Sequence, residues 1–133
     1  MKFVVTGNKK LSGSIYISGS KNSTLPILSG CLLTDKDIIL NNIPNLKDVN
    51  IMIQLLSSIG VKFNFLGYKS LQINTSNINI SNINYKIVNK IRTSILLLGP
   101  ILTKYKKIKL SLPGGCKIGY RPINFHIKTL SVK

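Results

Sequence analysis

Apolar residues recur along this chain at two spacings, and the two spacings alternate. Segments with the alternation or β-branched composition of strands are separated by segments with helical periodicity. Strands are expected at residues 3–6, 14–18, 37–40, 61–65, 70–73 and 107–112, with turns at Ser12-Gly13 and Gly67. Residues 76–84 alternate Asn and Ser with Ile, which suits an exposed strand or a loop. The pattern predicts an α/β fold.

Four helices are expected between these strands. The first begins near Asn22 and tolerates Pro26 in its first turn, and the second is capped by Asn45 and ended by Gly60. The third runs from about residue 86 to 103, and the last starts near Pro122. The inward positions of the first three are expected to be Ile27, Leu28, Cys31 and Leu32, then Val49, Met52, Ile53, Leu56 and Ile59, then Ile87, Ile91, Ile95 and Leu98.

A strand, a loop containing a proline and a helix occur twice, first from residue 38 and again from residue 108. The first unit continues through Gly60 into a further strand. The second would need the same continuation beyond Lys133. This weak internal repeat predicts an incomplete second unit, as in a fragment or a truncated gene product.

Charge is the unusual feature of the composition. The 19 Lys and Arg residues face 3 acids, Asp35, Asp37 and Asp48, for a formal net charge of +16. Such a balance can mark a nucleic-acid binder. However, Lys, Ile and Asn, which share A/T-rich codons, are enriched together, and the aromatic residues are not interleaved with the basic ones. Mutational bias explains the charge better, although a positive field still favours anionic substrates.

The chain shows no targeting or metal-binding pattern. Its amino terminus lacks the apolar length of a signal peptide, and its longest apolar stretch, residues 94–102, is broken by Gly99 and Pro100. Cys31 and Cys116 lie far apart in a chain with 1 His, which indicates neither a zinc site nor a disulfide framework. We expect a soluble, cytoplasmic protein without a metal or cofactor.

The segment around Cys116 is the strongest candidate for chemistry. Three glycines surround this cysteine directly after an expected strand, and Lys117 and Arg121 lie close by in sequence. Glycines allow backbone amides to approach an anion and allow a loop to open and close. Neighbouring cations favour the thiolate. The alternative is a buried, inert cysteine, but such residues usually have apolar neighbours, as Cys31 has. We therefore expect a reactive thiol in an active-site loop.

Four sequence blocks together resemble one enzyme family. Residues 112–123 read Leu-Pro-Gly-Gly-Cys-Lys-Ile-Gly-Tyr-Arg-Pro-Ile, which resembles the catalytic loop of UDP-N-acetylglucosamine 1-carboxyvinyltransferases. Residues 11–28, 42–49, and 91–94 with 98–100 match three further blocks of that family in order and spacing. The resemblance covers essentially the whole chain and is to the amino-terminal part of the family's sequence. It implies part of an inside-out α/β barrel built from repeated βαβαββ units, with helices at the centre and sheets outside.

The resemblance also implies a reaction. Family members transfer the enolpyruvyl group of phosphoenolpyruvate to the 3-hydroxyl of UDP-N-acetylglucosamine and release phosphate, through a tetrahedral intermediate. This is the first committed step of peptidoglycan synthesis, and so serves cell-wall biogenesis, cell shape and division. By this resemblance Cys116 protonates the methylene carbon of phosphoenolpyruvate as general acid, and fosfomycin alkylates the same thiol.

The remaining site residues come from the same resemblance. Lys21 and Asn22 match the phosphoenolpyruvate-binding positions. Residues matching the UDP-N-acetylglucosamine site are Arg92, Arg121, Pro122, Ile123, Asn124 and Phe125. From the residues alone, Lys21 reads as a solvated lysine near a helix start, Arg92 as an exposed helix residue and His126 as a structural residue.

The chain departs from the family pattern at three points. Asn124 stands where the family usually has Asp, and Lys117 follows the cysteine where a small or hydroxyl residue is usual. Family members are also about three times longer, with two lobes that close over the substrates. The resemblance assigns residues 1–19 to strands joining the opposite lobe, and 20–133 to an incomplete lobe carrying the catalytic loop. A second lobe is therefore an expected partner. The alternatives are an inactive truncated remnant and a small basic nucleic-acid-binding protein.

Overall fold

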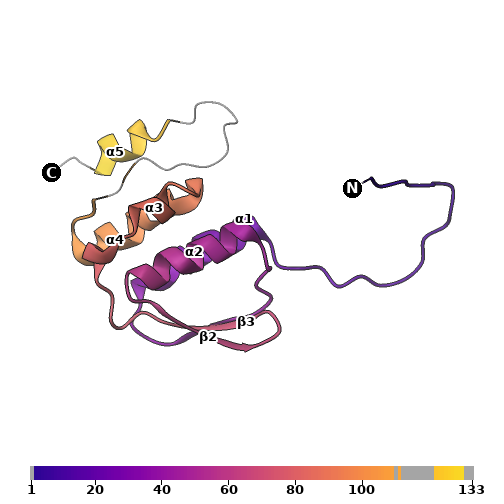
Figure 1. Cartoon of the computed structure of the whole chain (residues 1–133), viewed down its shortest axis with the longest axis horizontal. Helices are drawn as coiled ribbons and strands as arrows, with labels where there is room; N and C mark the ends of the chain where they lie inside the picture. Colours follow the sequence, from indigo (N-terminus) through magenta and orange to yellow (C-terminus); the bar gives the residue numbers. More distant parts are fainter. Residues whose placement is uncertain (1, 110, 112–121, 131–133) are drawn as a thin grey trace.

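A computed structural model of the chain describes residues 2–109, 111 and 122–130. A small sheet lies on one side of helices α1 (Lys21–Gly30) and α2 (Lys47–Ser58), and helices α3 (Tyr85–Val88) and α4 (Leu98–Tyr105) lie on the other (Figure 1). Helix α2 is therefore the middle layer.

The sheet has three antiparallel strands in the order β1-β3-β2, formed by β1 (Ile38–Leu40), β2 (Lys62–Gly67) and β3 (Ser70–Asn74). These three expected strands are confirmed. Along β3, burial alternates as period-two geometry requires, with Leu71 and Ile73 facing the helices. Ile73 pairs with Ile38 on one side and Phe63 on the other, which centres it in the sheet.

The outer face of the sheet is polar around β3. The Asp37 carboxylate accepts hydrogen bonds from Gln72 Nε2 at 3.2 Å and Asn74 Nδ2 at 2.6 Å. Asn64 Nδ2 donates to Gln72 Oε1 at 3.4 Å. An apolar inner face and a hydrogen-bonded outer face together exclude a one-residue slip of register.

Helix α1 differs from its expectation at two positions. Ser20 caps it, and Pro26 is its sixth residue, beyond the expected first turn. A proline there leaves the carbonyl of Asn22 without its helical donor, which is tolerated because Asn22 is exposed to water. Leu28 is buried as expected, but Ile27 is 50% exposed and was wrongly placed on the inner face.

Helix α2 has the expected buried face but not the expected cap. Leu46 is its capping residue and supplies no side-chain hydrogen bond, while Asn45 Oδ1 accepts from the Asn50 side chain at 3.1 Å. The prediction of Asn45 as cap was therefore wrong by one position. Gly60 follows the helix with φ +101°, a left-handed conformation, and an added Cβ there would overlap the carbonyl oxygen of Asn77.

The single helix expected over residues 86–103 is instead three pieces, and that prediction was wrong. Helix α3, the 3-10 helix η3 (Arg92–Leu97) and α4 follow one another, with Ile91 extended between the first two. The Ser94 hydroxyl donates to the carbonyls of Val88 and Ile91, so a side chain replaces backbone donors where the helix breaks. Buried positions shift accordingly to Ile91, Leu97 and Ile101, while Ile87, Ile95 and Leu98 are only half-buried.

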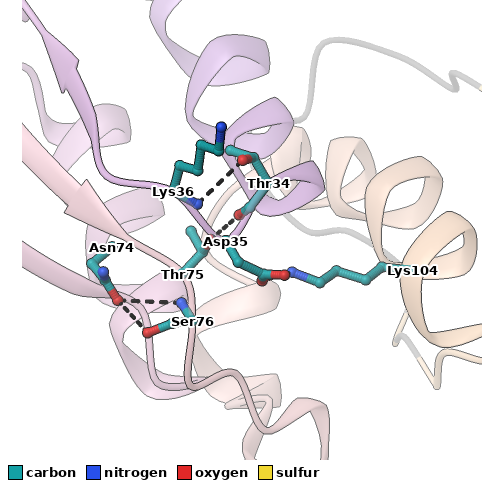
Figure 2. A network of polar contacts seen from close by, with 7 residues as sticks. All are labelled: Thr34, Asp35, Lys36, Asn74, Thr75, Ser76 and Lys104. Atoms are coloured by element: carbon teal, nitrogen blue, oxygen red, sulfur yellow. Dashed lines mark hydrogen bonds and ion pairs between the residues drawn. The ribbon is translucent and has the colours of Figure 1, made fainter.

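A polar network fastens the far end of the sheet to the helices (Figure 2). The Thr75 hydroxyl donates to the carbonyl of Thr34, which follows the 3-10 helix η1 (Cys31–Leu33), and Lys104 of α4 pairs with Asp35. Asn74 Oδ1 accepts from both the amide and the hydroxyl of Ser76. Thr34 and Asp35, which follow η1, are thus bonded to Thr75 after β3 and to Lys104 of α4.

Three expected strands are not formed by the described residues. Residues 2–16 run as an exposed arm away from the body (Figure 1), while residues 17–19 are joined to Asn42 by hydrogen bonds. Of the strand expected at residues 107–112, only residues 107–109 and 111 are described, and they form no strand. The strands expected at residues 3–6 and 14–18 are therefore not formed, because a strand needs a partner for its backbone groups. The expected loop at 76–84 contains the 3-10 turn η2 (Ile80–Asn82), and the last helix, α5 (Asn124–Leu130), begins close to its expected start.

The buried position of Ile73 gives a matched test of the core. Ile73→Val should lower the free energy of unfolding by about 0.5–1.5 kcal/mol, because a buried methyl group is lost. Ile39→Val, at a residue of β1 that is 57% exposed, should change it by less than about 0.5 kcal/mol. Urea unfolding followed by circular dichroism measures both. Equal effects, or unfolding without a cooperative transition, would contradict this core.

Candidate active site

The structure places part of the predicted site. Of the predicted binding residues, Lys21, Asn22, Arg92 and Pro122 to Phe125 are described. Cys116 and Arg121 lie outside the described residues, so the predicted reactive thiol and its loop remain predictions.

Lys21 is the first residue of α1, directly after the capping residue Ser20. Ser20 Oγ accepts from the amide of Ser23 at 3.4 Å, and its carbonyl accepts from the amide and hydroxyl of Thr24. The amides of Lys21 and Asn22 precede the first intrahelical hydrogen bonds, so they face outward at the positive end of the helix. Lys21 and Asn22 are both exposed. This end of α1 can therefore offer an ammonium group and backbone amides to one anion.

Asp48 forms an ion pair with Lys21 at the start of α1, and no role was predicted for it from the sequence. Its Oδ2 lies 3.0 Å from Lys21 Nζ, although 27 positions separate the two residues. Asp48 belongs to the first turn of α2, so the ion pair joins the amino-terminal ends of the two helices. The side chains are 43% and 40% exposed, which limits the pair's contribution to stability to about 1 kcal/mol or less. The sequence signal that could have indicated a role for Asp48 was its position as an acidic residue in the first turn of α2.

The backbone that leads into Lys21 is set by Gly19 and Asn42. The amide of Gly19 donates to Asn42 Oδ1 at 3.1 Å, and Asn42 Nδ2 donates to the carbonyl of Ile17 at 3.4 Å. Asn42 itself has φ +59°, a conformation that asparagine tolerates better than most residues. A Cβ at residue 19 would overlap the carbonyl oxygen of Asn42. The close approach therefore requires glycine at this position.

Arg92 begins η3 and is half-buried. The same 3-10 helix is tied to α1, because Ser29 Oγ donates to the carbonyl of Leu96 at 2.7 Å. Lys21 and Arg92 thus belong to two elements that pack on each other. The alternative that the residues alone left open for Arg92, an exposed helix residue, does not agree with its half-buried position.

The segment expected to bind the nucleotide sugar is exposed. Asn124 and Phe125 open α5, in which every residue is exposed, and Phe125 is 72% exposed. Ile123 is half-buried and Pro122 exposed. The structure therefore brings Lys21 together with Asp48, but shows no packed site at residues 122–125.

Cys31 has the environment expected of an unreactive thiol. It lies in the core at 5% exposure, as predicted from its apolar neighbours. Burial raises the pKa of the Cys31 thiol, because the thiolate would lose hydration, and a backbone hydrogen bond at the same residue offsets part of this rise. Cys31 should therefore stay protonated near neutral pH.

Among the described residues, no three His, Cys, Asp or Glu side chains come together in a group able to hold a metal ion. None of the helices in this part of the chain combines the length and the apolar character needed to cross a membrane.

The overall fold is similar to that of a solved enolpyruvyl transferase. The structure superposes on the enolpyruvyl transferase NikO from Streptomyces tendae with a TM-score of 0.62 and 18% identity, over 74% of this chain and 23% of that one. The expected enolpyruvyl-transferase-like α/β fold is confirmed by this likeness.

The sequence comparison then names the family. The pattern of EPSP synthase (3-phosphoshikimate 1-carboxyvinyltransferase) matches residues 5–132, so the chain belongs to the EPSP synthase family. Relatives named UDP-N-acetylglucosamine 1-carboxyvinyltransferase include those of Hydrogenovibrio crunogenus, 47% identical over 96% of this chain, and Buchnera aphidicola subsp. Schizaphis graminum, 50% identical over 97%. The chain spans only 30% and 31% of the length of these relatives.

The close approach at Gly19 predicts a position-specific effect. Gly19→Ala should lower the free energy of unfolding by about 1–3 kcal/mol, because the added methyl group displaces the Asn42 backbone. Gly7→Ala is the matched control, since nothing lies within 4 Å of a Cβ there. Urea unfolding gives the energies, and amide exchange at Gly19 reports the hydrogen bond to Asn42. A Gly19→Ala variant that unfolds like Gly7→Ala would refute the close approach.

The raised pKa of Cys31 predicts a loss of stability at alkaline pH. Above the ordinary thiol pKa the unfolded chain releases a proton that the folded chain still holds, so ionisation favours unfolding. The stability contributed by the neutral thiol is therefore present at neutral pH and is lost as pH rises toward the raised value. Unfolding energies of the wild type and Cys31→Ala, compared between about pH 7 and pH 10, should converge with rising pH. A constant difference would show that the thiol ionises equally in both states.

Proposed function

We propose that this chain is the amino-terminal part of a UDP-N-acetylglucosamine 1-carboxyvinyltransferase. The reaction would transfer the enolpyruvyl group of phosphoenolpyruvate to the 3-hydroxyl of UDP-N-acetylglucosamine and release phosphate. One observation carries the proposal: relatives 43–51% identical over about 97% of this chain share that name. In this role the protein acts in the cytoplasm at the first committed step of peptidoglycan synthesis.

Lys21 and Asn22 are the proposed contacts for phosphoenolpyruvate. The substrate carries a phosphate and a carboxylate, and the start of α1 offers an ammonium group beside outward-facing amides. Both side chains are exposed and therefore accessible to a ligand. The ion pair with Asp48 occupies one side of the ammonium group and leaves its other donors for the substrate.

Cys116 is the proposed general acid. Its thiol would give a proton to the methylene carbon of phosphoenolpyruvate while the sugar 3-hydroxyl adds to the adjacent carbon and forms the tetrahedral intermediate. Loss of phosphate from that adjacent carbon, together with loss of a proton from the new methyl group, would then restore the double bond. The sequence support is local, since Lys117 and Arg121 are cations that favour thiol ionisation and the glycines allow the loop to close.

The nucleotide sugar is proposed to contact Arg92 and residues 121–125. A guanidinium group suits a diphosphate through paired hydrogen bonds, and the half-buried Arg92 lies on an element tied to α1. Asn124 can accept a hydrogen bond like the Asp usual there, but without its charge. The exposed state of α5 means that this contact would form only when substrate or further protein covers it.

A further part of the enzyme is required by this proposal. The chain spans about 30% of its relatives' length, and it has no acid after Asp48 to accept a proton from the sugar hydroxyl. We propose that residues 2–19 pair with the opposite lobe. Phe3, Val5, Ile15 and Ile17 are each at least 80% exposed along this arm, as expected of a strand whose partner is not on this chain.

Fosfomycin labelling tests the assignment of the thiol. When the chain is combined with a polypeptide carrying the remaining lobe, fosfomycin should add covalently to Cys116 and raise the mass by one adduct. Cys116→Ser should abolish the adduct while leaving UDP-N-acetylglucosamine affinity largely intact, because a nearly isosteric side chain is retained. Cys31→Ser is the control and should leave labelling unchanged, since Cys31 is buried. Labelling that persists in Cys116→Ser, measured by mass spectrometry of peptides, would refute the role of Cys116.

A further inference from the structure

Lys21 lies where its own helix disfavours it. The amino-terminal end of a helix carries partial positive charge, so an ammonium group in the first turn is less stable there than at the other end. Ser20 already caps α1, so the helix does not need Lys21 for its hydrogen bonds. The cation is tolerated because the Asp48 carboxylate lies 3.0 Å away.

Asp48, by contrast, lies where its helix favours it. As the second residue of α2 it places a carboxylate at the positive end of a helix that has no side-chain cap. Helices α1 and α2 pack against each other, so the carboxylate is held by a fixed element while it contacts the lysine. The carboxylate of Asp48, on the first turn of α2, therefore restrains the end of the longer and more flexible Lys21 side chain.

We infer that Asp48 is a positioning residue for the anionic substrate of this site. The carboxylate takes one donor of the Lys21 ammonium group and fixes the side chain, which leaves two donors for an anion. A lysine side chain has many rotamers, and fixing it in advance removes a cost that binding would otherwise carry. This inference rests on the proposed function, because the anion is taken to be phosphoenolpyruvate.

The negative charge of Asp48 and its positioning of Lys21 have opposite effects on anion binding. If Asp48 only added negative charge near the site, its neutralisation would strengthen anion binding. If it positions Lys21, neutralisation weakens binding despite the gain in net positive charge. The chain offers a matched control in Asp35, which pairs with Lys104 of α4 and gives the same change of charge when replaced.

The experiment combines the 133-residue chain with a polypeptide carrying the remaining lobe and compares Asp48→Asn, Asp48→Glu and Asp35→Asn with the wild type. Limiting acetic anhydride acylates accessible lysines, and peptide mass spectrometry reports the rate at each one. A lysine held by a carboxylate must leave the pair before it reacts, so Asp48→Asn should raise the rate at Lys21 severalfold and leave Lys104 unchanged. Asp35→Asn should do the reverse, and Asp48→Glu should keep most of the protection of Lys21.

Phosphoenolpyruvate titrated against amide resonances of the same proteins gives the second readout. Asp48→Asn should weaken binding about three- to tenfold, the range expected for one side chain fixed in advance. Asp35→Asn should leave binding unchanged or slightly stronger. Thermal unfolding and the amide spectrum away from residue 48 show whether each variant keeps its fold.

The outcomes separate the two proposals. Unchanged acylation of Lys21 in Asp48→Asn, or phosphoenolpyruvate binding as tight as in Asp35→Asn, would overturn the positioning role. If the wild-type chain combined with the remaining lobe binds no phosphoenolpyruvate, while Lys21 still gains reactivity in Asp48→Asn, the substrate assignment of the proposed function is contradicted and the ion pair remains established.

Discussion

The burial of one sheet face beneath α1 and α2 is the interaction on which the rest of the structure depends. Leu71 and Ile73 of the central strand are almost completely buried beneath the helices, as are Leu28 and Leu56 on the helices themselves. A sheet of three short strands has little stability alone, so its order requires this apolar contact. The same contact fixes α1 beside α2, and this arrangement places their amino-terminal ends close enough for Lys21 to reach Asp48.

Local periodicity was enough to predict the elements that this contact holds. The three strands, α2 and its terminating Gly60 follow from alternation, helical spacing and a glycine with positive φ. Two of the predictions were wrong. Residues 3–6 have the composition of a strand but have no described strand to pair with. Residues 86–103 have helical spacing but form three separate helical pieces, with the Ser94 hydroxyl bonded to carbonyls at the break.

The candidate site was predicted from sequence in its parts but not in its geometry. A glycine-rich cysteine segment is a local signal that points to anion chemistry through charge and backbone, whereas Lys21 and Asn22 were assigned to the site only by the family resemblance. The Lys21–Asp48 pair joins residues 27 positions apart, and no periodicity connects them. The requirement for glycine at residue 19 likewise arises from the approach of Asn42, which belongs to the loop after β1.

The three carboxylates give the composition a structural meaning. Each one contacts a different element: Asp35 pairs with Lys104 of α4, Asp37 accepts two side-chain amides of β3, and Asp48 holds Lys21 of α1. Acids are absent everywhere else in a chain of net charge +16. Mutational bias toward lysine and asparagine would raise the positive charge without regard to place, whereas these acids all lie at junctions between elements. The few acidic side chains of this fold therefore hold elements together or, at Asp48, position the Lys21 ammonium group. The remaining positive charge produces an electrostatic field that attracts molecules with several negative charges.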